Sequence, residues 1–296
     1  MLPKVGAGGG VPAGRWRPRE TGYVAAMGDE LRPDVHRYLA RIGWTADLSP
    51  APTLEHLFGL QLAHMTSVAF ENLHVVAGTR PPTALDWSLP KIVDQRRGGW
   101  CFEINGAFAA LLRALGYDVT LHSAQVWSAQ AKELGPELDH LCLIVTVDDA
   151  RWLVDAGFGD SSVTPVSLDT RDEQHRLPRR ARVEHDDHGR IVYLEWMQWD
   201  DWEVQYVIDP TPRQLPEFQP RSDELASGAG GGHFSEKPFA TRALNEHGDR
   251  VWLLRDRLKV RRGDGHRSPT ETPVAAGAWD DVLREWFEME PLNRTE

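Results

Sequence analysis

The stretch Arg97-Gly98-Gly99-Trp100-Cys101-Phe102-Glu103 joins a double glycine to one of only two cysteines in a chain of 296 residues. The glycines interrupt any preceding element, and apolar residues then recur at helical spacing over residues 102–115. We therefore expect a helix that begins near Cys101. The first helical turn presents backbone N–H groups and the positive end of the dipole, which favour an anionic sulfur. Because a cysteine attacks as its thiolate, Cys101 is a candidate nucleophile.

Two downstream segments supply the groups that a cysteine nucleophile needs. His140 begins an apolar run over residues 141–147, and Asp155 ends a second strand-like run over residues 151–155. The segment Asp148-Asp149-Ala150-Arg151 between them predicts a hairpin turn. In such an antiparallel hairpin, residues whose numbers sum to roughly 296 to 298 face each other, which brings His140 toward Asp155. Asp155 can then orient the imidazole, as the third member of a nucleophile, base and orienter set.

The motifs together resemble the arylamine N-acetyltransferase family, from about residue 32 to the last strand-like segment. Besides the Cys101 stretch, the motifs that carry the resemblance are Ala69-Phe70-Glu71-Asn72-Leu73, Lys91-Ile92-Val93, Asp139-His140-Leu141, Val154-Asp155-Ala156-Gly157-Phe158-Gly159 and His233-Phe234-Ser235. The resemblance implies that Cys101 is the nucleophile, His140 its base and Asp155 the residue that fixes the imidazole. Two positions depart from the family pattern. Asp139 stands where relatives often have a small or hydroxyl residue, and a carboxylate there would favour a cationic His140; Gln125 stands where bacterial relatives often have arginine.

The residue pattern predicts three parts. Residues 27–116 contain helical segments at 34–42, 53–66 and 92–96 and the helix of Cys101, and residues 117–220 contain short strand-like segments at 119–126, 141–147, 151–155, 191–196 and 202–208. That strand series suggests a small antiparallel barrel or sandwich. Residues 221–296 combine strands at 239–244, 250–254 and 258–262 with an amphipathic helix at 279–288. Residues 1–26 are rich in Gly, Pro and Arg and read as a disordered extension before a start at Met27.

The resemblance implies a fold of the α+β class, in which a helical bundle, an antiparallel β-barrel and an α/β lid bring together a triad arranged as in cysteine proteases. It also implies acetyl-CoA as the acyl donor. Residues at matching positions would line the amine pocket (Phe70, Val126 and Phe158) or contact CoA (Gly159, His233, Phe234 and Ser235). The alternative is that the first three are ordinary core residues, and that the glycine-rich segment 228–232 only connects two elements.

The expected chemistry is a ping-pong transfer through an acetyl-cysteine intermediate, with an arylamine or arylhydrazine as acceptor. His140 would take the amine proton, and backbone N–H groups, including that of Cys101, would stabilise the oxyanion. One alternative keeps Cys101 but closes a lactam from a carrier-bound polyketide chain, as an amide synthase does. Another alternative, from a different class, is a cysteine hydrolase; nothing in the sequence suggests the export or the propeptide that a peptidase usually has.

Composition narrows the class of protein. A net charge of −11 argues against a nucleic-acid partner, and no run approaches the ~18 apolar residues of a membrane helix. Two cysteines make no disulfide framework, which favours a reducing, cytoplasmic location. None of the twelve histidines shows the spacing of a metal site with cysteines, so we expect no metal. The expected partners are therefore small molecules, an aromatic amine and CoA, bound by a monomer or a homodimer.

Several other residues that stand out in the sequence are expected to support the fold rather than take part in the reaction. Arg97 and Glu71 are expected to form a buried pair that braces the nucleophile loop. The arginine-rich residues 179–182 read as a solvated face, and residues 185–188 as a turn. Cys142, inside an apolar run, is expected to be inert. The tryptophans at 196, 199 and 202 are expected to pack beside a hairpin that turns at residues 200–201.

Overall fold

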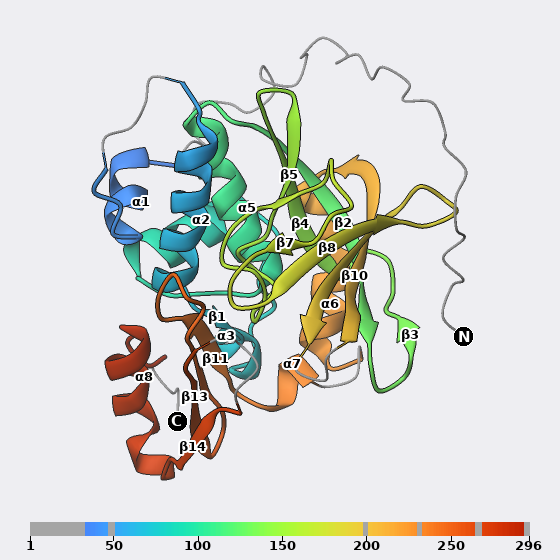
Figure 1. The fold of residues 1–296 in the computed structure, drawn as a ribbon. Coiled ribbons are helices and arrows are strands. Elements are labelled where there is room, and N and C mark those ends of the chain that lie inside the picture. The colour runs from blue at the N-terminus through green and yellow to red at the C-terminus, as the bar shows by residue number, and fades with distance from the viewer. Residues whose placement is uncertain (1–32, 47–50, 198–200, 230–232, 264–267, 293–296) are drawn as a thin grey trace.

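The helix expected after the double glycine is α5 (Cys101–Ala114), and it lies at the centre of the fold. Its residues from Cys101 through Leu112 are all buried, as is typical of a helix covered on every side. The computed structural model describes residues 33–46, 51–197, 201–229, 233–263 and 268–292 (Figure 1). The extension predicted at residues 1–26 lies outside these ranges.

Helices from the first third of the chain pack around α5. They are α1 (Val35–Arg41), α2 (Leu54–Ser67), α3 (Leu73–Val76), α4 (Leu85–Leu89) and a π-helix (Pro90–Asp94). Side chains cap the first two where the sequence predicted their starts: Asp34 accepts a hydrogen bond from the Arg37 N–H, and Thr53 accepts one from His56. The helical segment predicted at residues 92–96 is the π-helix, which begins and ends two residues earlier.

The middle of the chain forms an antiparallel sheet that curls into a nearly closed barrel beside α5 (Figure 1). Its strands lie in the order β6-β5-β4-β2-β10-β9-β8-β7, and β3 pairs with β2. The bounds are β2 (Asp118–Ser128), β3 (Glu133–Leu134), β4 (His140–Val147), β5 (Ala150–Val154), β6 (Val166–Ser167), β7 (Gln174–His175), β8 (Arg180–His185), β9 (Ile191–Met197) and β10 (Asp201–Arg213).

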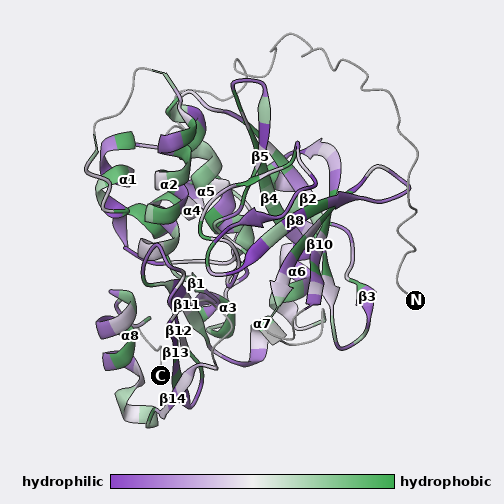
Figure 2. Cartoon of the chain, in the orientation of Figure 1, coloured by the Kyte–Doolittle hydropathy of each residue, from purple (hydrophilic) through white to green (hydrophobic). Residues whose placement is uncertain are grey.

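Alternating side chains of β4 serve two separate cores. Leu141, Leu143 and Val145 belong to the core shared with α5, whereas Cys142 and Ile144 belong to the core inside the barrel. This alternation follows from the period of two in a strand. In Figure 2 the apolar residues gather on α5 and on the strands that face it, which is where the two layers meet.

The sequence interpretation of residues 179–182 as a solvated face is wrong for Arg179 and Ala181, which are buried, whereas Arg180 and Arg182 are half-exposed. Three of these residues form the start of β8, Ala181 is fully buried, and Arg179 is only 5% exposed. Arg179 is tolerated there because it forms ion pairs with Glu195 and Asp160. The predicted hairpin of β9 and β10 is confirmed: Trp196 lies opposite Trp202 with the rings in edge contact, while Trp199 lies outside the described residues.

The last part of the chain forms a smaller antiparallel sheet in the order β1-β11-β12-β13-β14, with α8 packed against it (Figure 1). We call this sheet and its helices the lid. The bounds are β1 (Phe70–Glu71), α6 (Gln219–Ser227), α7 (His233–Glu236), β11 (Ala240–Ala243), β12 (Arg250–Leu253), β13 (Arg257–Arg261), β14 (Thr270–Pro273) and α8 (Trp279–Phe287). Because β1 comes from the first part of the chain, the sheet spans two predicted domains. The predicted boundaries at 116 and 220 therefore stay a prediction.

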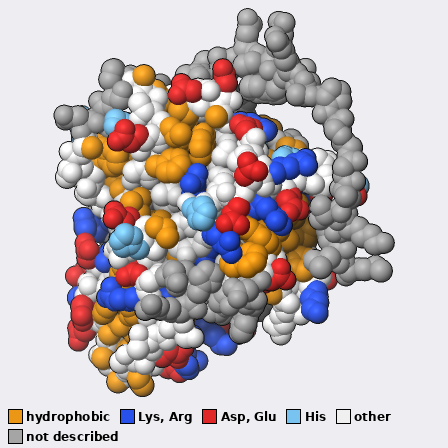
Figure 3. Space-filling view, in the orientation of Figure 1, with side chains coloured by type: hydrophobic (Ala, Val, Ile, Leu, Met, Phe, Trp, Pro, Cys, Tyr) orange, Lys and Arg blue, Asp and Glu red, His pale blue; other side chains and the backbone are white. Residues whose placement is uncertain are grey.

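The described surface carries charges of both signs. Figure 3 shows acidic and basic side chains interspersed over the visible face. No helix in the described ranges is both long enough and apolar enough to cross a membrane.

Candidate active site

Cys101 occupies the first position of α5, immediately after the extended residue Trp100. The Glu103 carboxylate turns back and accepts a hydrogen bond from the Trp100 N–H at 3.2 Å, which fixes the start of the helix. Only glycine fits at position 98, in the loop that leads into α5, because a Cβ there would lie 1.9 Å from the carbonyl oxygen of Ala69. The Gly99 carbonyl accepts a hydrogen bond from the Glu71 N–H, and the Gly99 N–H donates to the Ala69 carbonyl, so the loop before Cys101 lies against β1. Cys101 itself is 8% exposed.

The predicted hairpin is confirmed, and it brings the base and the orienter together. Leu143 faces Val154 and Ile144 faces Leu153, which is the register expected from the turn. His140 is the first residue of β4, and Asp155 directly follows β5. The His140 Nε2 lies 2.7 Å from the Asp155 Oδ2, and both side chains are nearly fully buried. The other ring nitrogen, Nδ1, is thereby left for the sulfur.

The loop after Asp155 lies directly over Cys101. A Cβ at Gly157 would be 3.0 Å from the Cα of Cys101, so a larger residue would push the loop away from α5. The Cys101 side chain lies near enough to the same imidazole to help raise the pKa of His140. The structure therefore brings the sulfur, the imidazole and the carboxylate of the three predicted residues into one connected set.

The imidazole is strongly biased toward its cation. Burial by itself lowers the pKa of His140, but the charge and hydrogen bond of Asp155 and the neighbouring Cys101 together raise it to about 10. Burial also disfavours the charged form of Asp155 and so raises its pKa. The charge and hydrogen bond of His140 outweigh burial and hold the pKa of Asp155 below its ordinary value. At neutral pH the pair is therefore an imidazolium and a carboxylate.

Two further residues position Asp155, and sequence reasoning missed both. The Asn105 amide donates to the Asp155 Oδ1 at 2.9 Å and to the Leu141 carbonyl at 2.6 Å, and the Tyr206 hydroxyl donates to the Asp155 Oδ2 at 2.8 Å. Asn105 lies four residues after Cys101, one helical turn along the same face of α5, and that spacing was a usable signal. Tyr206 had no such signal, because its position depends on the register of β10.

The carboxylate of Asp139 does not have the influence on His140 that the sequence suggested. Arg221 on α6 donates to the Asp139 Oδ1 at 2.6 and 3.0 Å. The carboxylate that makes His140 cationic is instead Asp155. Gln125, the other position that departs from the family pattern, is fixed by two hydrogen bonds: it donates to the Gly135 carbonyl and accepts from Arg190.

Buried charges brace the nucleophile loop from behind. The predicted pair is present, with the Arg97 Nε 3.8 Å from the Glu71 carboxylate, and Lys91 adds contacts to Glu71 at 3.6 Å and to Glu103 at 2.8 Å. Burial raises the pKa of Glu71, but Lys91 and Arg97 hold it below its ordinary value. The helix start at Cys101 is therefore tied to β1 and the π-helix through this cluster.

Aromatic side chains surround the triad. Phe158 contacts the His140 ring edge-on at 5.1 Å between centroids, and it also contacts Tyr206. Val126 lies opposite Tyr206 on β2. Phe70 stacks on Phe239. The three residues predicted for the amine pocket are thus half-buried and border this region, and their role as pocket residues stays a prediction.

The residues predicted to contact CoA lie on the lid side of the site. Phe234 on α7 contacts the rings of both Phe70 and Trp100. Gly159, with a positive φ of 88°, lies against Phe70, and Ser235 follows Phe234 on α7. His233 begins α7, and its side chain lies outside the described residues. Their contacts with CoA stay a prediction.

The state of the two cysteines and the grouping of the possible metal ligands bear on the class of enzyme. Both cysteines are free, and burial raises the pKa of Cys142 well above its ordinary value, in agreement with an inert thiol. Within the described ranges, no cluster of three or more His, Cys, Asp or Glu could hold a metal ion. A cysteine, a cationic histidine and a buried aspartate, assembled between a helix and a barrel, are the arrangement expected of an enzyme with a cysteine nucleophile.

Comparison with known proteins identifies the family. An N-acetyltransferase family model matches residues 53–294. An arylamine N-acetyltransferase of Mycolicibacterium smegmatis is 35% identical over 193 residues, which cover 61% of this chain and 66% of that protein. The pineal gland isozyme NAT-3 of Gallus gallus is 37% identical over 209 residues, which cover 65% of this chain and 72% of that protein.

A solved structure extends the agreement to the fold. The arylamine N-acetyltransferase of Mycobacterium marinum in complex with CoA superposes with a TM-score of 0.77, at 27% identity, and covers 86% of this chain and 93% of that one. This protein is therefore an acyltransferase. It belongs to the arylamine N-acetyltransferase family, as the sequence motifs implied, and the α+β fold with its barrel is confirmed.

Proposed function

We propose that this protein transfers acetyl groups from acetyl-CoA to arylamines or arylhydrazines through an acetyl-Cys101 intermediate. The single observation that carries the proposal is the connected set of Cys101, His140 and Asp155, whose imidazole is held as a cation. An imidazolium beside a cysteine stabilises the thiolate that must attack. Family membership supplies the expected donor and acceptor.

In the first half-reaction, the Cys101 thiolate attacks the thioester carbonyl and forms a new carbon–sulfur bond. Backbone N–H groups at the start of α5, including that of Cys101, are suited to stabilise the oxyanion. The bond to the CoA sulfur then breaks, and the His140 imidazolium can protonate the departing thiolate. This leaves acetyl-Cys101, free CoA and a neutral imidazole that Asp155 still orients.

In the second half-reaction, the amine nitrogen attacks the acetyl-cysteine and loses a proton to the neutral His140. The bond between the acetyl carbon and Sγ breaks, which regenerates the thiolate and the imidazolium. Phe158 contacts the His140 ring, so an aromatic amine that reaches the histidine would meet another aromatic surface there. Phe70 and Val126 extend the proposed amine pocket, and Gly159, His233, Phe234 and Ser235 are proposed to contact CoA.

Family membership favours acetyl transfer over the amide synthase and hydrolase alternatives. We also propose a cytoplasmic location, because the nucleophile must remain a reduced thiol. Cell fractionation would test the location, and sedimentation would distinguish a monomer from a homodimer.

Intact mass spectrometry tests the proposed function directly. Incubation with acetyl-CoA alone should add one acetyl group to the protein, and an arylamine should remove it as the acetylated amine. Cys101→Ala should abolish the adduct, whereas Cys142→Ala, which changes the buried and inert cysteine, should keep it. An adduct that survives in Cys101→Ala would refute the nucleophile, and an adduct formed only from carrier-bound chains would favour lactam closure.

A further inference from the structure

A buried group of charged side chains joins the loop after Asp155 to the barrel and the lid. It contains three arginines and two carboxylates, linked by ion pairs. Its members are Arg179, Arg250, Arg261, Asp160 and Glu195. We call this group the arginine cluster. Because three guanidinium groups share two carboxylates, the cluster carries an excess of one positive charge.

Arg250 is the arginine of the cluster that is held least completely. Its side chain is 2% exposed, its Nε lies 3.3 Å from the Asp160 Oδ1, and its Nη1 donates to the Thr241 hydroxyl at 3.3 Å. Among the residues that the structure describes, neither its Nε nor its Nη2 has a hydrogen-bond partner, and the same holds for the Arg261 Nε. Unsatisfied N–H groups on a buried cation are costly, so these donors indicate an acceptor from outside the chain.

The strand register places two of the arginines against each other. Arg250 on β12 lies directly opposite Arg261 on β13, a position in which like charges destabilise a sheet. Burial lowers the pKa of Arg250 to about 10, aided by Arg261 and Arg179 and opposed by Asp160. Arg250 therefore stays charged at neutral pH. An anion beside Arg250 and Arg261 would relieve the repulsion between them.

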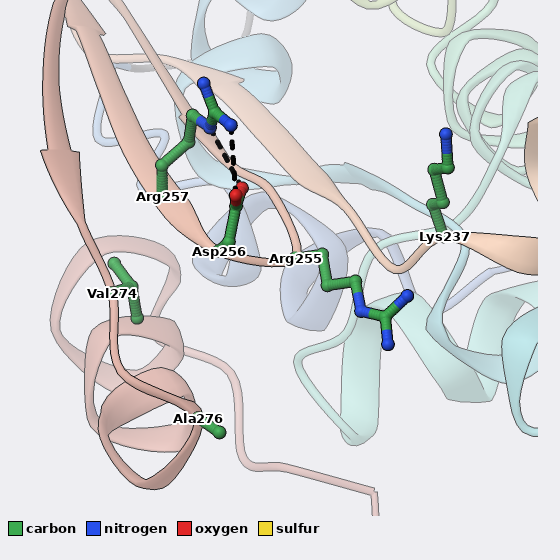
Figure 4. A pocket seen from close by; sticks show the side chains of 6 residues that line it. All are labelled: Lys237, Arg255, Asp256, Arg257, Val274 and Ala276. Carbon is green, nitrogen blue, oxygen red and sulfur yellow. Dashed lines mark hydrogen bonds and ion pairs between the residues drawn. The ribbon is translucent and has the colours of Figure 1, made fainter.

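Other charged groups of the lid already have partners. Arg257 lines a hollow of about 530 Å³ on the lid, and Figure 4 shows its guanidinium held by Asp256, at 2.9 Å. Glu271 adds a second carboxylate to Arg257 at 3.1 Å. Asp249, the residue before Arg250, is bound instead by Arg262 at 3.3 Å and by the N–H of residue 263 at 2.6 Å. The excess positive charge thus belongs to the arginine cluster.

We propose that the arginine cluster binds one chloride ion, held by the unpartnered N–H groups of Arg250 and Arg261. A monovalent anion matches the excess of one positive charge, whereas sulfate would bring a second negative charge into a buried site. Chloride accepts hydrogen bonds and donates none, which suits a site made of guanidinium donors. The ion can reach the cluster beside Asp160, whose side chain is 28% exposed. Bound there, it would help to hold β12 and β13 against the loop after Asp155.

Urea denaturation at constant ionic strength tests the proposal, with sodium chloride replacing sodium gluconate, whose anion is too bulky for a buried site. Once chloride exceeds its Kd, each tenfold increase in chloride should lower the unfolding equilibrium constant about tenfold, because only the folded protein binds the ion. Arg250→Met removes the excess charge and should reduce this response to less than about twofold. Arg257→Met, which removes a lid arginine with carboxylates of its own, is the matched control and should keep the full response.

Bromide locates the ion in the unaltered protein, so this measurement does not require any variant to fold. Bromide resembles chloride in charge and size, and it scatters X-rays anomalously. Crystals grown with bromide should show an anomalous peak within hydrogen-bond distance of the Arg250 Nη2.

Several results would overturn the chloride site. A flat response to chloride in the unaltered protein would show that the folded chain binds no such ion. A response that persists in Arg250→Met, or one that is lost equally in Arg257→Met, would place the effect of chloride outside the arginine cluster. Bromide peaks elsewhere, with none beside Arg250, would lead to the same conclusion.

Discussion

Asp155 and Asp160 lie five residues apart in the same loop, yet their surroundings differ in kind. Among side chains, Asp155 accepts hydrogen bonds from one cation, His140, and from the neutral side chains of Asn105 and Tyr206. All of these partners are buried. The charge on Asp155 is therefore matched by a cation that can give up its proton.

Asp160 is instead held by three arginines. Arg261 binds both carboxylate oxygens, at 2.6 and 2.8 Å, and Arg179 and Arg250 each lie 3.3 Å away. Arg179 also pairs with Glu195 at 2.7 Å. Burial raises the pKa of Asp160, but the arginines hold it far below its ordinary value. Burial, aided by the neighbouring arginines, lowers the pKa of Arg250 to about 10.

The different partners of Asp155 and Asp160 show how one loop both serves the active site and holds the barrel and the lid together. A carboxylate paired with an imidazole controls a proton that a reaction can use. A carboxylate held by guanidinium groups, which stay charged near neutral pH, can only hold elements together. Asp160 joins the loop to the barrel through Arg179 and to the lid strands β12 and β13 through Arg250 and Arg261. We expect Asp155 to govern rate and Asp160 to govern stability.

The largest expected effect is on catalysis by Asp155→Asn. The variant loses the charge that keeps His140 cationic and correctly oriented, so acetylation of Cys101 should slow by about a thousandfold to ten-thousandfold, as for other triads. Rapid measurement of CoA release in a single turnover checks this. Asp160→Asn is the control and should stay within about tenfold of the unaltered protein per folded molecule, since it touches no reacting group. An equal loss of acetylation rate in the two variants would show that Asp155 has no special role in catalysis.

Asp160→Asn should instead have the larger effect on stability. It leaves buried arginines without their shared carboxylate, and breaking a buried ion pair costs about 3 to 5 kcal/mol of unfolding free energy. Asp155→Asn should cost less, because His140 can release its proton and become neutral. Urea denaturation of both variants measures the two values. A loss below about 1 kcal/mol in Asp160→Asn would show that the cluster does not hold the lid.

The two aspartates also differ at alkaline pH. Folding raises the pKa of His140 from 6.5 to about 10, so the folded protein keeps a proton that the unfolded chain has released. Stability from this proton is complete below the unfolded pKa and is lost as the pH rises toward the folded one. Between about pH 7 and about pH 9, the unfolding free energy should fall by up to about 1.4 kcal/mol per pH unit.

Asp155→Asn should flatten the part of that slope that comes from His140. Asp160→Asn should keep that part, because Asp155 and Cys101, and not Asp160, raise the pKa of His140. Both are measured in a Cys101→Ala background, so that Asp155 is compared without the contribution of Cys101 to the pKa of His140. Identical slopes in the two variants would mean that Asp155 is not the main cause of the raised pKa of His140.

The smallest expected effects come from two matched tyrosines. Tyr206 donates to Asp155, whereas Tyr193 donates to Glu195 of the arginine cluster at 2.5 Å. Removing either hydroxyl should cost about 1 to 3 kcal/mol of stability, the value of a hydrogen bond to a charged group. Tyr206→Phe should also slow acetylation by about tenfold, while Tyr193→Phe should leave the rate within about twofold. A rate loss confined to Tyr193→Phe would reverse the assignment.

The sequence by itself determined that Cys101, His140 and Asp155 come together, and it determined most of the elements around them. The double glycine and the apolar spacing after it predicted the start of α5 at Cys101, and the turn between two apolar runs predicted the register that joins His140 to Asp155. These signals are local: a helix start and a tight hairpin depend on residues that are close in the chain.

Only the tertiary structure decided what supports the triad. Tyr206 reaches Asp155 because β10 pairs with β2 and β9 in a particular register, and Arg179 is buried rather than solvated because it meets Glu195 and Asp160 across the barrel. A charged side chain looks the same in a sequence whether water or a carboxylate neutralises it. Its partner is set by the packing of distant elements, and that packing is the product of the whole fold.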